Sequence, residues 1–222
     1  IVTGLVGSEM CIRDRALPAI LGAILAARLK RLFWFCIAII WVLGCKAVLS
    51  LTVVFIGFWL LAFEKRKSYG LIALFLGILW FIVVTQGIIP FFSGEEVAGV
   101  GRYNYLGDSV VGIIINILLQ PGAVLGKILS WETIKYIFLL FLPVIWGIFP
   151  LLQKNQPVLP NLIPLIPTTP TIILNVLSEV SFQRSLNYQY SLPAISFLLL
   201  TIISCLAAVS YTHLRAHETR NY

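Results

Sequence analysis

The chain has 222 residues, of which 59% are apolar and 11% are charged, and its formal net charge is +7. Soluble domains carry about 25% charged residues, so this composition excludes a water-facing globular protein, and the high hydrophobicity excludes a disordered one. The positive charges are scattered among apolar runs, which argues against a nucleic-acid partner. The composition therefore predicts an all-α, polytopic transmembrane protein whose partner is the lipid bilayer.

The two ends of the chain are related to each other as DNA. The first fourteen codons can be written as the reverse complement of the last fourteen. Protein chemistry imposes no such relation, so we interpret residues 1–15 and 208–222 as translated sequencing adapter. On this interpretation residues 16–207 are one transmembrane domain that is truncated at both ends. Both histidines then belong to the adapter and carry no catalytic or metal chemistry.

Apolar runs predict the first spans, because a helix crosses the bilayer core with about 20 residues. The first long run is interrupted at Lys46, so we expect two short helices, 32–44 and 47–63, joined by a tight turn. Residues 69–92 are expected to form one span that ends at Pro90.

The second half of the chain has shorter and more broken runs. Residues 110–119 and 123–129 are too short to span, so we expect interfacial or re-entrant pieces. Residues 159–174 contain four prolines and cannot be a regular helix throughout. They either cross the bilayer again or re-enter it, and the sequence leaves both open. The remaining spans, which bring the total to about five, are expected at 136–152, kinked at Pro143, and at 192–207.

Lysine and arginine predict the orientation. The basic clusters 28–31 and 64–67 bracket the first hairpin and should both be cytoplasmic by the positive-inside bias. Residues 93–135 and Lys46 then lie on the outer side. Of the twelve basic residues between 16 and 207, seven fall on the cytoplasmic side, against one of the six acids. The basic balance is therefore explained by topology.

Polar residues that interrupt the apolar chain on the outer side are the candidates for chemistry. The first group lies in the stretch 101–108, which contains two glycines, and comprises Arg102, Tyr103, Tyr105 and Asp108. An arginine offers a fork of donors to phosphate, and tyrosines can contact a glycan. These residues predict a site for an anionic headgroup or sugar. The alternative is an interfacial aromatic belt with a local Arg–Asp pair.

The second group lies in the polar stretch 175–190, just before the last span, and comprises Glu179, Arg184, Tyr188 and Tyr190. Such a loop can line a substrate cavity at the membrane face, or it can be a solvated connection with interfacial tyrosines. Lys46 is a weaker candidate, because a lysine near the interface extends easily to the headgroups. No cysteine spacing indicates a metal site. We expect no cofactor, although a divalent cation remains possible.

An ordered set of motifs runs through the chain. It comprises Lys46 between two apolar runs, the Ile-Ile-Pro at 88–90, Arg102-Tyr-Asn-Tyr-Leu-Gly, Leu142-Pro143, Asn175-Val-Leu-Ser and the stretch 188–193. In this order and spacing the motifs resemble the C-terminal half of a bacterial membrane protein family, the domain of unknown function 2079. The resemblance covers nearly all of residues 16–207. Its members often carry acids after the lysine that matches Lys46, where this chain has Ala47-Val-Leu-Ser.

The resemblance implies an integral-membrane glycosyltransferase of the GT-C type, which uses polyprenyl-phosphate sugars at the outer face of the bacterial inner (plasma) membrane. Enzymes of this type place their catalytic carboxylate in an early outer loop, which we expect to precede this stretch, so the catalytic residue is unknown. The candidates would then divide by chemistry: Arg102 and Arg184 for phosphate, Asp108 and Glu179 for a metal or sugar hydroxyls, and Tyr103, Tyr105, Tyr188 and Tyr190 for the glycan.

A second hypothesis is a non-catalytic membrane protein, such as a transporter or an assembly partner. Broken, proline-rich segments at membrane depth are also typical of transporters.

Overall fold

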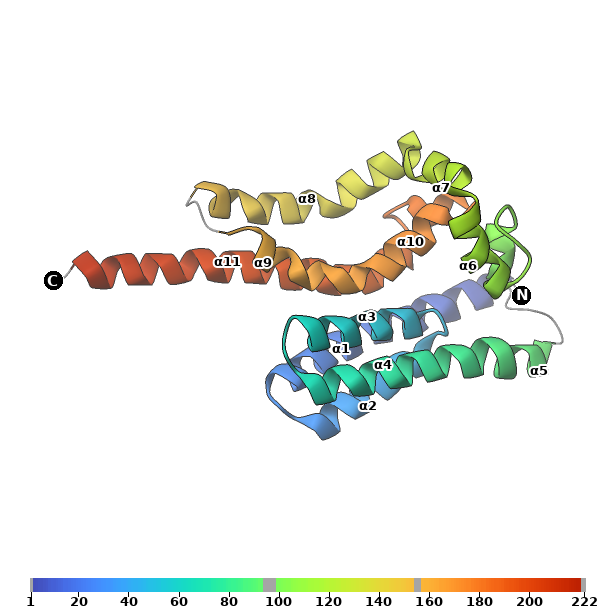
Figure 1. Ribbon diagram of the computed structural model, residues 1–222, viewed down its shortest axis with the longest axis horizontal. Helices are drawn as coiled ribbons and strands as arrows, with labels where there is room; N and C mark the ends of the chain where they lie inside the picture. The colour runs from blue at the N-terminus through green and yellow to red at the C-terminus, as the bar shows by residue number, and fades with distance from the viewer. Residues whose placement is uncertain (1, 94–98, 154–156, 221–222) are drawn as a thin grey trace.

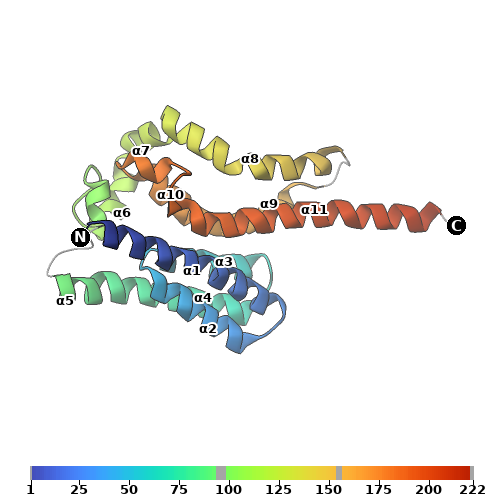
Figure 2. The ribbon, with the colours of Figure 1, turned by 180° about the vertical axis from the view of Figure 1, so that it is seen from behind.

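The computed structural model describes residues 2–93, 99–153 and 157–220, and the side chains of 15–92, 99–152 and 157–210. Within these residues every regular element is helical. The helices form two stacked groups that run along the long axis of the molecule, with α1–α5 in one group and α8–α11 in the other (Figures 1 and 2). The expected all-α polytopic architecture is confirmed.

The first group opens with α1 (Val2–Arg28), which packs against the predicted hairpin. The two short hairpin helices are confirmed as α2 (Leu32–Cys45) and α3 (Leu49–Ala62), and the turn between them contains Lys46. A core of fully buried side chains, among them Phe35 and Trp59, joins these helices. The sequence did not predict α1, because residues 16–28 alone are too short to span.

The next span is confirmed at Lys67–Phe92, within two residues of its predicted bounds. It comprises α4 (Lys67–Ile82), a π-helical turn η1 (Val83–Ile88) and α5 (Ile89–Ser93). The Ile89 N–H donates to the Val84 carbonyl five residues back, which is the π-helical pattern. Pro90 was expected to end the span but instead is the second residue of α5. It lies inside the continuous helix Lys67–Phe92, directly after the π-helical turn, and such local π adjustments accommodate a proline within a membrane helix.

Two short helices follow at one end of the molecule (Figure 1). They are α6 (Val110–Leu119) and α7 (Pro121–Ile128), and they bend by 89° relative to each other. Ser109 caps α6 by accepting the Gly112 N–H at 3.0 Å. The bend agrees with the expectation that these two segments are interfacial or re-entrant pieces, each too short to span the bilayer.

The second group consists of α8 (Trp131–Gln153), the proline-rich stretch and α11 (Leu192–Arg220). The proline-rich stretch is helical along its length but is tightened to a 3-10 helix in its centre: α9 (Leu159–Leu162), η3 (Ile163–Thr168) and α10 (Thr169–Leu177). As predicted, it is not a regular α-helix throughout. Phe197 of α11 belongs to the first core and Leu198 to the second, so α11 joins the two groups.

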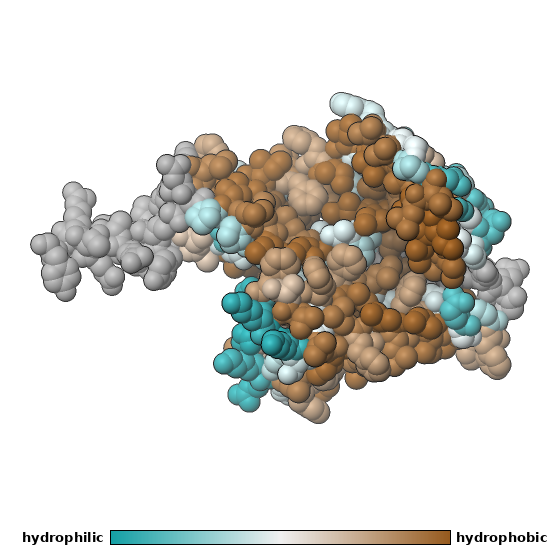
Figure 3. Space-filling view, in the orientation of Figure 1, coloured by the Kyte–Doolittle hydropathy of each residue, from teal (hydrophilic) through white to brown (hydrophobic). Residues whose placement is uncertain are grey.

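The described helices include four that are long and apolar enough to cross a membrane, or five if the bent pair α6 and α7 counts as one. The four are Lys67–Phe92, Trp131–Leu152, Leu159–Leu177 and Gln189–Ser210. The total agrees with the expected number of about five, but its members differ. The two hairpin helices α2 and α3, which were counted as spans, are shorter than the others, whereas the proline-rich stretch, which the sequence left open, is long enough to cross. Figure 3 shows an apolar face over most of the helices, with hydrophilic residues gathered toward their ends. Such a surface suits a lipid environment.

Candidate functional site

The two polar stretches singled out in the sequence meet at one end of the helices. The Glu179 N–H donates to the Arg102 carbonyl at 2.9 Å, although the two residues are 77 positions apart. Arg102 belongs to a 3-10 turn, η2 (Val100–Tyr103), and Glu179 follows the end of α10. This end also holds the α2–α3 turn, opposite the two basic turns of the first group (Figure 1). The two stretches that contain the candidate residues therefore lie together, and we describe them as one candidate site.

Tyr103 and Tyr105 bind the end of α10. Their hydroxyls donate to the carbonyls of Leu174 and Leu177, each at 2.9 Å. A helix leaves its last four carbonyls without partners, and the two tyrosines satisfy two of them. Burial raises the pKa of Tyr103 to about 12. Burial also raises the pKa of Tyr105, with a smaller contribution from Glu179, so both phenols are neutral at physiological pH.

Arg184 is bound by backbone carbonyls and a carboxylate of the protein. Its guanidinium donates to the carbonyls of Ser178 at 2.6 Å and Val176 at 3.3 Å. It also pairs with Glu132 of α8 at 2.9 Å. The Arg184 side chain is only 7% exposed, whereas that of Glu132 is 63% exposed. Arg184 thus fastens its own 3-10 turn, η4 (Ser181–Arg184), to α10 and α8.

Arg102 is in a different position from Arg184. Its guanidinium carbon lies 5.7 Å from the centre of the Tyr190 ring, and the side chain is half-buried. No carboxylate among the described residues lies within ion-pair distance of Arg102, so the local Arg–Asp pair of the belt alternative is not formed there. An arginine stacked on a ring, with no carboxylate partner among the described residues, is suited to an anionic ligand.

The aromatic side chains of the second stretch gather beside Arg102. The Phe182 ring centre lies 5.6 Å from those of both Tyr188 and Tyr190. Tyr190 belongs to a short turn, η5 (Gln189–Ser191), that leads into α11. The exposed ring of Tyr188 offers a face that a sugar can stack on.

The two carboxylates of the prediction are both exposed. Asp108 follows Gly107, whose φ of +147° lies in the region that favours glycine. Glu179 is close enough to Tyr105 to raise the pKa of that phenol. Among the residues that the structure describes, no three potential metal-ligating side chains come together.

Sequence reasoning missed a buried polar chain beneath this site. The Asn175 side-chain amide donates to the Tyr136 hydroxyl at 3.0 Å, and this hydroxyl also shares a hydrogen bond with Ser191 at 2.9 Å. All three side chains are buried. Tyr136 lies in an apolar run and reads as an ordinary core residue, so only Asn175 gave a signal.

A cavity of about 390 Å³ opens between α8 and α11, beside the buried hydrogen bonds of Tyr136 and Ser191. Leu140 and Pro143 of α8 and Ile195 of α11 line the part that runs along the helices. Asn187, Tyr188 and Gln189 line the part at the helix ends. The cavity is therefore apolar along the spans and polar at the level of the site.

Fold and site together define the class: a multi-pass, all-α membrane protein with one polar site at an end of its spans. The family described as Predicted membrane protein (DUF2079) matches residues 15–220, and the chain belongs to this family. No curated protein and no solved structure matches the chain. The interpretation of residues 1–15 and 208–222 as adapter stays a prediction.

Proposed function

We propose that the polar site binds a polyprenyl-phosphate sugar, as part of a GT-C-like glycosyltransferase that works at the outer face of a bacterial inner membrane. The observation that carries this proposal is the Arg102 guanidinium, which stacks on Tyr190 and has no carboxylate partner among the described residues. Phosphate matches the donor fork of arginine. The resemblance of the sequence motifs, which implies an enzyme of the GT-C type, supports the same proposal.

The surroundings of Arg102 suit the other parts of such a ligand. Tyr188 and Tyr190 present ring faces to the sugar, and Asn187 and Gln189 present amides to its hydroxyls. The cavity between α8 and α11 extends from these residues into the apolar part of the spans, where a polyprenyl chain would lie. Polar head and apolar tail thus have adjoining places.

The reaction follows from the proposed ligand. An acceptor hydroxyl attacks the anomeric carbon, the bond from this carbon to the phosphate oxygen breaks, and the phosphate leaves with the electron pair. A carboxylate takes the proton of the hydroxyl. Arg102 would stabilise the charge that develops on the leaving phosphate. No residue of this chain is assigned as the base.

A transporter or an assembly partner is the alternative function. The observation that favours a transporter is the helix broken by η3, together with the 89° bend between α6 and α7. An ion-coupled transporter ordinarily places carboxylates or histidines within its spans. Of the described spans, only the first turn of α8 contains a carboxylate, Glu132. The enzyme is therefore the better-supported proposal.

Binding of a short-chain polyprenyl phosphate to the purified chain tests the role of Arg102. The Arg102→Ala variant should bind this probe about tenfold more weakly or worse, because a hydrogen bond to a charged group contributes about 1.5–3 kcal/mol. Lys135→Ala is the matched control, since Lys135 is an exposed cation near the start of α8 at the same end. Equal binding by the two variants, both folded by circular dichroism, would refute the phosphate role.

Two further measurements separate the enzyme from the alternative. Tyr188→Ala should weaken a sugar-bearing probe more than the bare polyprenyl phosphate, because only the former needs the ring face. In proteoliposomes, a transporter would move the probe across the bilayer without transferring its sugar. Movement without transfer would favour the alternative.

A further inference from the structure

Two basic turns meet at the end of the molecule opposite the polar site. Arg28 lies in the first turn, and its guanidinium lies 3.9 Å from the Glu64 carboxylate of the second. Arg66 of the second turn donates to the Arg28 carbonyl at 3.3 Å. We call the six cations of the two turns the basic patch: Arg28, Lys30, Arg31, Lys65, Arg66 and Lys67. The only carboxylate within these two turns is Glu64.

The backbone makes both turns tight. Lys30 and Lys65 have φ values of 57° and 54°, in the left-handed region. These two conformations reverse the chain within a few residues and hold the cations of each turn close together. Hydrophilic residues form a distinct patch at this end in Figure 3.

The hairpin beside the basic patch is short for a membrane. α2 and α3 have 14 residues each, which gives a helix length of about 21 Å against a hydrocarbon core of about 30 Å. The mismatch draws the basic patch toward the lipid phosphates. Phe33 and Trp34 are 70% and 62% exposed just after the first turn, as is typical of residues at the interface.

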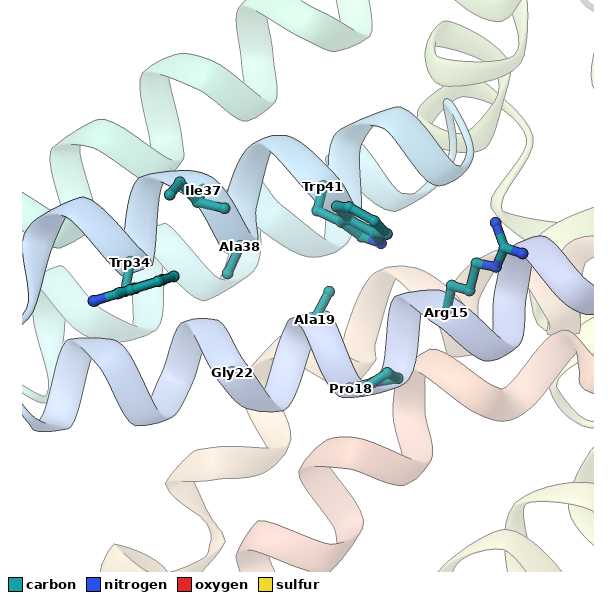
Figure 4. A pocket seen from close by; sticks show the side chains of 8 residues that line it. All are labelled: Arg15, Pro18, Ala19, Gly22, Trp34, Ile37, Ala38 and Trp41. Carbon is teal, nitrogen blue, oxygen red and sulfur yellow. The ribbon is translucent and has the colours of Figure 1, made fainter.

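A groove runs from this end along the surface between α1 and α2 (Figure 4). Its volume is about 390 Å³. Trp34, Ile37 and Trp41 of α2 line one side, and Ala19 and Gly22 of α1 leave room on the other. Trp34 lies three residues after Arg31, so the groove begins beside the basic patch.

We propose that the basic patch and this groove bind one anionic phospholipid of the surrounding bilayer. The lipid phosphate lies on the cations of the patch, and an acyl chain lies in the groove. Charge complementarity selects this occupant, because six cations face a single carboxylate in the two turns. The site lies at the end opposite Arg102, so it does not depend on the proposed glycosyltransferase function.

Lipid retention by the chain tests the proposal. The chain is reconstituted in nanodiscs of phosphatidylcholine with phosphatidylglycerol, and the lipids that remain after transfer to detergent are measured by mass spectrometry. The chain should retain phosphatidylglycerol in preference to phosphatidylcholine. The R31Q/K67Q variant removes two exposed cations to which the structure assigns no side-chain hydrogen bond or ion pair among the described residues. Its preference should fall about fivefold per cation.

Two more variants complete the design. Lys135→Gln, which removes a cation at the opposite end, should leave the preference unchanged. Gly22→Leu should reduce retention, because an added Cβ there meets nothing within 4 Å and the longer side chain fills the groove. Equal retention of the two lipids, or equal losses in R31Q/K67Q and K135Q, would overturn the proposal. Displacement of the lipid by inorganic phosphate alone would show that the groove has no part in binding.

Discussion

The close approach of α3 and α4 gives the sharpest stability prediction. An ideal Cβ at Gly57 would lie 2.6 Å from the Leu74 nitrogen and 2.8 Å from the Gly70 carbonyl oxygen. The first distance is about 0.8 Å shorter than the 3.4 Å at which ordinary contact begins. Both neighbours are backbone atoms, so a rotamer change cannot relieve the contact. The Gly57→Ala change must therefore push the two helices apart.

The magnitude follows from two opposing effects. Overpacking a well-packed core costs about 1–3 kcal/mol, and a gap of 0.5–1 Å along the interface forfeits roughly a quarter to a half of its dispersion energy. Against this cost, alanine in place of glycine stabilises the helix by about 1 kcal/mol through its higher helix propensity. We expect the upper end of the cost, and hence a net loss of about 2 kcal/mol in the free energy of unfolding. Titration with sodium dodecyl sulfate, followed by circular dichroism, measures this loss.

Gly22→Ala is the matched control, because a Cβ at Gly22 meets nothing within 4 Å. It should be neutral or stabilising by up to about 1 kcal/mol. Gly70→Ala should destabilise like Gly57→Ala, since its Cβ would lie 2.8 Å from the Gly57 oxygen. The double variant should cost less than the sum of the two, because one separation relieves both contacts. A Gly57→Ala protein as stable as Gly22→Ala would refute the reasoning.

Three further predictions concern the polar site. Tyr136→Phe should cost about 1–3 kcal/mol in thermal or detergent unfolding, because the Asn175 amide and the Ser191 hydroxyl each lose a buried hydrogen bond. Tyr188→Phe, at an exposed ring, should cost nothing measurable. Arg184→Ala should destabilise by at least about 2 kcal/mol through the carbonyls it leaves unpaired. Glu132→Gln should cost under about 1 kcal/mol, since that carboxylate is largely solvated. Equal losses in Arg184→Ala and Glu132→Gln would contradict the conclusion that Arg184 stabilises the fold mainly through the carbonyls. Because the pKa of Tyr103 is raised from 10.0 to about 12 in the folded chain, its contribution to stability should be complete below pH 10 and lost as the pH rises to about 12. In Tyr103→Phe, the free energy of unfolding should change less with pH between pH 10 and 12. An unchanged pH dependence would contradict the burial of this phenol.

The sequence could predict most of the spans because apolar runs are a local property. The boundaries shifted where the end of a helix is polar. α8 was expected from residue 136 but begins at Trp131, since its first turn contains Glu132 and Lys135. That turn faces the polar site, so apolar composition alone could not include it. The π-helical turn before Pro90 depends on backbone hydrogen bonds that no residue pattern specifies.

The sequence predicted the two stretches of the candidate site separately. It did not predict that they contact each other. The hydrogen bond from Glu179 to Arg102 joins residues that no spacing rule connects. Sequence reasoning assigned the same phosphate role to Arg102 and Arg184, because residue type was the only information. Burial separates them: Arg184 is enclosed by carbonyls and Glu132, whereas Arg102 lies against the Tyr190 ring and has no carboxylate partner within the part of the chain that the structure describes.

The difference between Arg184 and Arg102 has a physical origin. At a membrane surface, the end of α10 exposes carbonyls that lipid cannot satisfy, so side chains of the protein must do so. Tyr103, Tyr105 and Arg184 serve that need and are thereby fixed in place. A residue already used in this way has few donors left for a ligand. In our proposal the ligand-binding role therefore belongs to Arg102. Replacing each of the two arginines by alanine in turn should separate loss of stability from loss of binding.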